Sequence, residues 1–175
     1  MHAILWLFTR LLAIALFRAG PQDLPASRSL VPLTLALYLL VDFLQARYLA
    51  GWVRRGVVVG LDALLLGAFV QSLLLWKRKI ARLRQTLGAL YGTGAVVGLA
   101  GLPLVDRMWD AEAAGRGGFG MSLLVLAYMA WAILVVAHVL RQALECRFDS
   151  AVGASIFLFL FTQLILALLV EKAGG

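Results

Sequence analysis

Apolar residues in this chain form long, nearly continuous blocks instead of the spaced positions that mark a helix with one buried face. A helix needs about 20 consecutive apolar residues to cross the hydrocarbon core of a membrane. Blocks of this length lie at about 30–50, 57–76, 86–105, 121–140 and 151–170. They predict an all-α fold, a polytopic integral membrane bundle of about five transmembrane helices in one membrane domain, residues 1–175.

The first 18 residues are also apolar, but they are short for a span and Arg10 interrupts them. We prefer an interfacial helix with a polar stripe of His2, Thr9 and Arg10, and a short membrane-spanning helix is the alternative. The segment AGPQDLPASRS at 19–29 predicts a loop before the first span, because it holds helix-breaking glycine and proline.

Composition supports the membrane class and changes the interpretation of the charge. The chain is 63% hydrophobic and only 14% charged, whereas a soluble domain is about 25% charged. A net charge of +7 would suggest nucleic acid as the partner of a soluble protein. Here the basic residues lie between the apolar blocks, where membrane topology and anionic lipid headgroups explain them. We therefore expect membrane lipids as partners, and no nucleic acid.

The densest basic segment, KRKIARLRQ at 77–85, joins the second and third spans and orients the bundle. We expect lipid headgroup contacts from its basic side chains, Lys77, Arg78, Lys79, Arg82 and Arg84. Basic residues on its side of the membrane outnumber those on the other side, which are Arg47, Arg54, Arg55, Arg107, Arg116 and Lys172. Because cytoplasmic loops carry the excess of Lys and Arg, we predict a cytoplasmic N-terminus and a C-terminus outside.

Glycines recur along the third span, at Gly88, Gly92, Gly94, Gly98 and Gly101. They include two GxxxG pairs, 88/92 and 94/98. Small residues let helix backbones approach closely in lipid, where dispersion replaces the hydrophobic drive. The pattern predicts tight packing at the centre of the bundle. Self-association, a contact with another membrane protein, or a helix break at a ligand site are the alternatives.

Two acids, Asp42 and Asp62, lie inside apolar spans on either side of the 51–56 hairpin. With a rise of about 1.5 Å per residue, both lie roughly 9–12 Å below that hairpin, at similar depth on adjacent helices. Arg47 lies nearby in depth and could pair with either acid. Because an intramembrane acid is costly, these residues form either a proton or cation site or a salt bridge that holds the hairpin together.

The remaining polar residues favour structural roles. His138, Arg141 and Glu145 share one face at the end of the fourth span, and a helix-end salt bridge with Arg141 is favoured over a metal site, because two candidate ligands are too few. Thr162 and Gln163 are interpreted as interhelical hydrogen-bonding groups. No GxSxG, HExxH or P-loop motif occurs, and there is one cysteine. We predict a protein that is not an enzyme and has no cofactor and no metal.

Three segments carry a resemblance to a known family, FRAGPQDLP (17–25), RQTLGALYGTGAVVGLAGLPL (84–104) and HVLRQALE (138–145). In these and in the order of its parts, the chain resembles the Yip1-type group of small multi-pass membrane proteins, and it is similar to uncharacterised proteobacterial membrane proteins. The resemblance implies a membrane-associated N-terminal segment, about five spans and a bacterial inner (plasma) membrane location. It implies no catalytic residues.

Two functional hypotheses follow from the sequence. The first is a non-enzymatic scaffold or accessory protein that acts through helix packing and basic loops facing lipid headgroups. The alternative is a small transporter or proton- or cation-coupled protein that uses Asp42 and Asp62. A hydrated cavity beside the acids would favour transport, and acids sealed against Arg47 would favour the scaffold.

Overall fold

The computed structural model describes residues 2–49, 51–115 and 118–172, and the regular elements in those ranges are all helical. They are α1 (His2–Ala15), η1 (Pro21–Asp23), α2 (Leu30–Gln45), η2 (Ala46–Tyr48), α3 (Trp52–Trp76), η3 (Ile80–Arg82), α4 (Leu83–Ala113), α5 (Phe119–Leu144) and α6 (Phe148–Lys172), where η marks a single 3₁₀ turn.

Within the described residues, five stretches of helix are long and apolar enough to cross a membrane: Leu30–Tyr48, Trp52–Trp76, Ile80–Glu112, Phe119–Leu144 and Phe148–Leu168. The predicted all-α bundle with about five membrane-length helices is therefore confirmed. Ala50, where the sequence predicts the first span to end, and Arg116, counted in the topology prediction, lie outside the described residues.

The largest difference from the predicted spans is at the end of α4. The apolar block ends at Val105, but the helix continues through DRMWDAEA to Ala113. The apolar block ends at the first charged residue, but the helix does not have to end there, because Ala, Met, Glu and Arg all favour helix. Tertiary contacts also hold the extension: Tyr48 stacks on Trp109 with ring centroids 4.8 Å apart, and the Tyr48 hydroxyl donates to Asp106.

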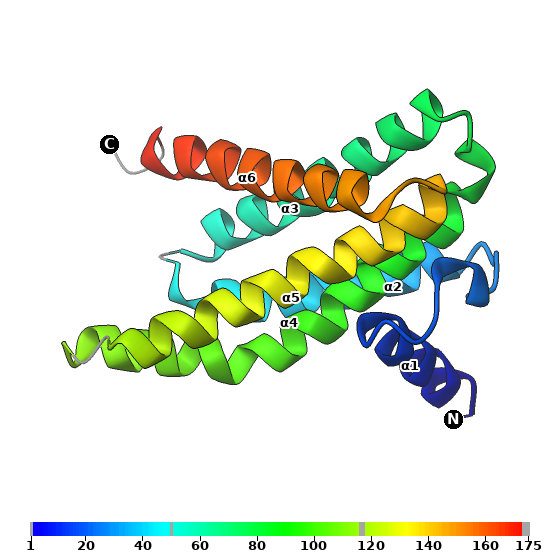
Figure 1. Ribbon diagram of the computed structural model, residues 1–175. Coiled ribbons are helices and arrows are strands. Elements are labelled where there is room, and N and C mark those ends of the chain that lie inside the picture. Colours follow the sequence, from blue (N-terminus) through cyan, green and yellow to red (C-terminus); the bar gives the residue numbers. More distant parts are fainter. Residues whose placement is uncertain (1, 50, 116–117, 173–175) are drawn as a thin grey trace.

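Helix α4 lies at the centre of the bundle. Helix α2 packs along it, α1 also contacts it, and α5 lies between α4 and α6 (Figure 1). Helix α3 contacts α2, α4 and α6. Ile14, Val70, Leu90 and Leu140 come from four different helices, and all are almost fully buried in the shared core.

The outer faces of the bundle are apolar. Leu64 on α3 is 70% exposed and Leu160 on α6 is 60% exposed, which suits side chains that meet lipid instead of water. The apolar part of α1, Leu5–Ala15, is shorter than a span. Its buried side includes Ile14, while Leu5 and Phe8 are exposed. The interfacial placement of this helix stays a prediction.

The five glycines of α4 face side chains from three other helices. A Cβ atom added at any one of them would lie within 2.7 Å of such a side chain, closer than real Cβ contacts come. The facing pairs are Gly88 with Leu30, Gly92 with Leu11, Gly94 with Tyr38, Gly98 with Val41 and Gln45, and Gly101 with Tyr128. The absence of side chains at these positions thus allows α1, α2 and α5 to approach the α4 backbone closely.

Candidate functional site

The two intramembrane acids meet where α2 and α3 pack together. The side chains of Asp42 and Asp62 are close enough to act on each other electrostatically. An ionised carboxylate has only acceptors, so two carboxylates form a hydrogen bond with each other only when one of them is protonated. The interface therefore brings two like acids together, one from each helix.

A tyrosine completes this pair. Tyr38 lies four residues before Asp42 on α2, so both side chains leave the same helix face, and its hydroxyl donates to Asp62. The Tyr38 ring packs against Tyr91 of α4, with ring centroids 5.4 Å apart. The Tyr91 hydroxyl in turn donates to the backbone carbonyl of Ala63 at 2.8 Å. The α4 helix thus positions the tyrosine that holds Asp62.

A pocket of about 140 Å³ opens beside the acid pair, with Tyr38 and Asp62 in its wall. Helix α6 contributes three polar side chains to the lining, Ser155, Thr162 and Gln163. The volume suffices for a few water molecules, and each water needs several polar partners of this kind. The pocket therefore combines an acid, hydroxyl groups and an amide at the depth of the apolar spans.

Arg47 does not seal the acids. Its guanidinium forms an ion pair with Asp106 near the end of α4. Helix α2 ends at Gln45, and the 3₁₀ turn η2 carries Arg47 to the polar end of the bundle. Neither Asp42 nor Asp62 forms an ion pair with a basic side chain among residues 2–49, 51–115 and 118–172. The sequence predicted Arg47 near the two acids because it assumed that the helix continues through residue 47, whereas the chain turns at η2.

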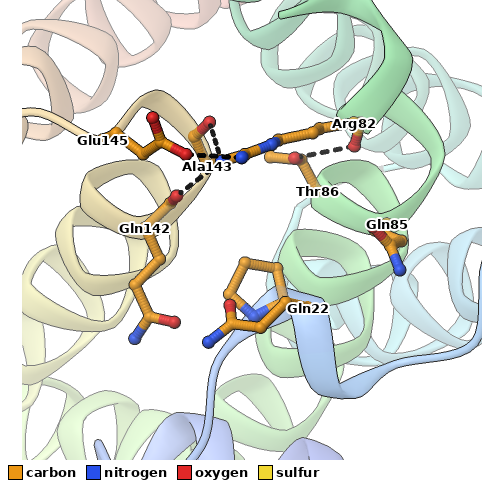
Figure 2. Close-up of a pocket in the computed structure, with 8 residues that line it drawn as sticks. Gln22, Arg82, Gln85, Thr86, Gln142, Ala143 and Glu145 are labelled. Atoms are coloured by element: carbon orange, nitrogen blue, oxygen red, sulfur yellow. Dashed lines mark hydrogen bonds and ion pairs between the residues drawn. The ribbon is translucent and has the colours of Figure 1, made fainter.

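The basic segment at 77–85 forms a second polar cluster at the opposite end of α3. Lys79 and Arg82 both form ion pairs with Glu145, which follows the last turn of α5. Arg82 also donates to the backbone carbonyls of Gln142 and Ala143 at 3.3 and 3.4 Å (Figure 2). A cation at a helix C-terminus is favourable because the last carbonyls lack intrahelical partners.

The other basic residues of this segment are exposed. Lys77 lies 4.9 Å from the centroid of the Trp76 ring, and Arg78 and Arg84 face outward. Trp76 itself is 76% exposed, as expected for an aromatic residue at a membrane interface. The five predicted headgroup contacts thus divide into Lys79 and Arg82, which pair with Glu145, and three residues free to meet the lipid surface.

Glu145 is held in an unusual backbone conformation, with φ at 50° in the left-handed region. Hydrogen bonds from Lys79 and Arg82 hold the pKa of the Glu145 carboxyl below its ordinary value of 4.5. The sequence favoured a pair between Glu145 and Arg141. Instead, Arg141 lies over the Phe148 ring. This is because the turn after α5 directs Glu145 toward the 77–82 segment.

His138 has a structural partner rather than a metal-like environment. Its Nε2 lies 2.8 Å from the Ala19 carbonyl and 2.8 Å from the Gln142 amide. No group of three metal-ligating side chains occurs among the described residues. The residues predicted to share one face at the end of this helix therefore have different partners. His138 contacts the loop after α1, and Glu145 pairs with the basic segment.

Sequence reasoning placed Asp42 and Asp62 at equal depth but did not find Tyr38 or the pocket. The spacing of Tyr38 and Asp42 was the available signal, because positions four apart share a helix face. The polar residues of α6 were visible as Thr162 and Gln163, but nothing in the sequence indicates that α6 packs beside α3.

The fold and these two clusters define a class, that of a helical bundle with the architecture of a multi-pass membrane protein. Comparison of the chain with protein-family models, with curated proteins and with solved structures finds no match. The resemblance to the Yip1-type group stays a prediction.

Proposed function

We propose that this protein is a small proton- or cation-coupled transporter whose coupling site is the pair Asp42 and Asp62. It is a multi-pass protein of the bacterial inner membrane in this proposal, with the N-terminus in the cytoplasm, and it is not an enzyme. The observation that carries the proposal is the close approach of two acids from adjacent spans, one of them hydrogen-bonded to Tyr38, that form no ion pair with a basic side chain among the described residues.

The cost of such a pair supports a functional role. Ionisable residues inside membrane spans are costly to bury, and those facing the bundle interior commonly mark ion pathways and proton relays. A salt bridge would offset that cost, but Arg47 is bound to Asp106 instead. Two neighbouring carboxyl groups titrate as a coupled pair, so one of them can hold a proton that the other releases.

Polar side chains around the two acids provide hydrogen-bonding partners for the exchange of a proton. Tyr38 donates to Asp62, and both line the pocket that holds Ser155, Thr162 and Gln163. Hydroxyl and amide groups can order water against a carboxyl group. The polar lining therefore favours a role in proton coupling over a purely structural contact between α2 and α3, because a structural contact needs no pocket beside it.

The test is proton flux in vesicles that contain the purified protein and a trapped pH-sensitive dye, driven by a potassium diffusion potential. We expect flux above that of protein-free vesicles, and we expect Asp62→Asn and Asp42→Asn to reduce it to that background. Repeating the assay with sodium replaced by choline separates proton coupling from sodium coupling.

The matched control is Asp106→Asn, which removes an acid of the same type from the end of the bundle. This variant should keep its flux, because Asp106 pairs with Arg47 near the end of α4 and with neither acid of the coupling site. Asp42→Asn combined with Asp62→Asn should still insert and purify as folded protein. Loss of folding in that double variant would contradict transport and support the scaffold hypothesis, in which the pair is a structural contact.

A further inference from the structure

A polar pocket of about 650 Å³ lies at the end of the bundle opposite the acid pair, and it belongs to none of the features used above for transport. Three segments line it (Figure 2). The lining residues are Pro21 and Gln22 of η1, Arg82, Gln85 and Thr86 around the start of α4, and Gln142, Ala143 and Glu145 at the end of α5. The volume lies within the range of roughly 300–1,000 Å³ found for small-molecule sites. We therefore considered which ligand its charges and donors would select.

The location is at headgroup depth. Trp76, an exposed aromatic residue of the kind that gathers at membrane interfaces, ends α3 just before the basic segment. The Gln85 amide donates to the Leu24 carbonyl at 3.0 Å, which fixes the loop before α2 against the start of α4. All three segments that line the pocket flank loops that the sequence assigns to the cytoplasmic side.

A cluster of ionic groups borders the pocket. Arg82 and Glu145 line it, and Lys79, which lies outside the lining, pairs with the same carboxylate. Because these two cations share one anion, the cluster of three groups carries one net positive charge, which a ligand with one negative charge would balance. Arginine is well suited to such a ligand, because its guanidinium presents several donors to phosphate oxygens.

The Gln142 amide gives the second, independent indication. His138 Nε2 lies 2.8 Å from the Ala19 carbonyl, which only accepts, so this nitrogen must carry the hydrogen. The Gln142 atom 2.8 Å from the same nitrogen is then assigned as the amide oxygen, which shares this one hydrogen with the Ala19 carbonyl. Its NH₂ group then takes the position of the buried amide atom that has no hydrogen bond among the described residues.

That NH₂ group would lie beside the Gln22 amide. An ideal Cβ atom at Gly20 would collide with both amides, so they converge on the same point. Figure 2 shows these two amides on one side of the pocket and the Arg82–Glu145 pair on the other. The pocket therefore offers a cation at one side and neutral hydrogen-bonding groups at the other.

We propose that this pocket binds the headgroup of a glycerophospholipid whose phosphodiester carries one negative charge and whose terminal group is a neutral polyol, as in phosphatidylglycerol. The phosphodiester would contact Arg82, and the headgroup hydroxyls would meet the Gln22 and Gln142 amides at the other side of the pocket. A zwitterionic headgroup such as phosphoethanolamine brings no net charge and would place its ammonium group near two cations.

The experiment is a lipid titration of the delipidated full-length protein in neutral detergent, followed by native mass spectrometry. Phosphatidylglycerol and phosphatidylethanolamine with identical acyl chains are compared, together with the water-soluble headgroup glycerophosphoglycerol. We expect one phosphatidylglycerol to bind in preference to phosphatidylethanolamine. Arg82→Gln should weaken its binding about tenfold or more, the effect of losing a hydrogen bond to a charged group.

The control variant is Arg84→Gln, which removes the same charge two residues away, at an exposed position outside the pocket. It should bind phosphatidylglycerol as the native protein does. Because Arg82 also holds Glu145, a second variant, Gln142→Glu, keeps that ion pair and places a negative charge at the other side of the pocket. It should also weaken phosphatidylglycerol binding, and the thermal unfolding temperature without lipid is measured for each variant so that lost binding in a folded protein is told apart from unfolding.

Equal binding of the two lipids, or equal losses in Arg82→Gln and Arg84→Gln, would overturn the proposal, because either result indicates general attraction to an anionic surface. Binding of glycerophosphoglycerol as tight as that of the lipid, with the same dependence on Arg82 and Gln142, would support the phosphodiester chemistry and assign the pocket to a soluble ligand. These outcomes do not depend on proton flux, so the pocket and the acid pair are tested separately.

Discussion

Two clusters of ionisable groups lie at different levels of the bundle, and they accommodate charge in opposite ways. Near the 51–56 turn, Asp42 and Asp62 bring like groups together, and the Tyr38 hydroxyl donates to Asp62. At the other end, Lys79 and Arg82 surround Glu145 with opposite charge in an exposed position.

The comparison teaches that position decides what a charged group contributes. An exposed ion pair gains little net energy, because water screens it, and its main effect is to orient loops. A pair of acids at the depth of the apolar spans is costly, and it persists only because the surrounding helices hold it there. The glycines of α4 are part of that support, since Gly94 lets Tyr38 approach α4 and reach Asp62.

The largest effect on stability should come from Gly94→Ala. A Cβ atom at this position would lie 2.6 Å from the Tyr38 ring, and such overpacking costs about 1–3 kcal/mol. We expect a lower free energy of unfolding, measured by SDS titration in mixed micelles. We also expect reduced proton flux, because the displaced ring carries the donor to Asp62.

Gly60→Ala is the matched control on α3. No atom outside the helix lies within 4 Å of a Cβ added there, and alanine favours a helix interior over glycine by roughly 0.5–1 kcal/mol. The control should be as stable as the native protein or more so. Equal destabilisation by both substitutions would show that close packing at Gly94 does not support the acid pair.

The sequence was sufficient for the apolar helices and for the common depth of the two acids, because both depend on spacing along the chain. Block length predicted which segments span, and the rise per residue placed Asp42 and Asp62 opposite each other. The recurrence of glycine in α4 likewise indicated close approach, although it did not indicate which helices approach.

The partners of charged residues were not predictable in the same way. Arg47 pairs with Asp106, a residue on α4 that the sequence assigned to a polar connection. Glu145 pairs with Lys79 and Arg82 because a left-handed residue after α5 turns its side chain away from Arg141. Both outcomes depend on turns and on packing between helices far apart in sequence, which periodicity does not encode.

Tyr38→Phe should have a smaller effect on stability than Gly94→Ala, and it isolates the hydroxyl from the ring. Removing the hydrogen bond to Asp62 should lower the free energy of unfolding by about 1 kcal/mol, and proton flux should change because Asp62 loses its donor. Tyr91→Phe removes the same atom from a bond to the Ala63 backbone. It should lower stability comparably and leave flux unchanged. Equal changes in proton flux in the two variants would show that Tyr38 is not part of the coupling site.

The smallest effect should come from Glu145→Gln, and its size depends on pH. The pKa of Glu145 in the folded protein lies below its ordinary value of 4.5 because Lys79 and Arg82 donate to the ionised carboxylate. The charged form therefore stabilises the fold above that ordinary value, and this contribution is lost as the pH falls through the lowered pKa. Glutamine cannot ionise, so the variant should be slightly less stable than the native protein near neutral pH.

This difference should vanish in acid, where the native carboxyl group is also neutral. The measurement is the midpoint of SDS-induced unfolding for both proteins across that pH range. The control is Asp149→Asn, which removes an exposed acid that lies 3.3 Å from Arg147. Two freely solvated side chains contribute little, so this control should not alter the midpoint at any pH. A difference between Glu145→Gln and the native protein that persists in strong acid would mean that residue 145 acts through packing. The contribution of Glu145 to stability would then depend on how its side chain packs, and not on its charge.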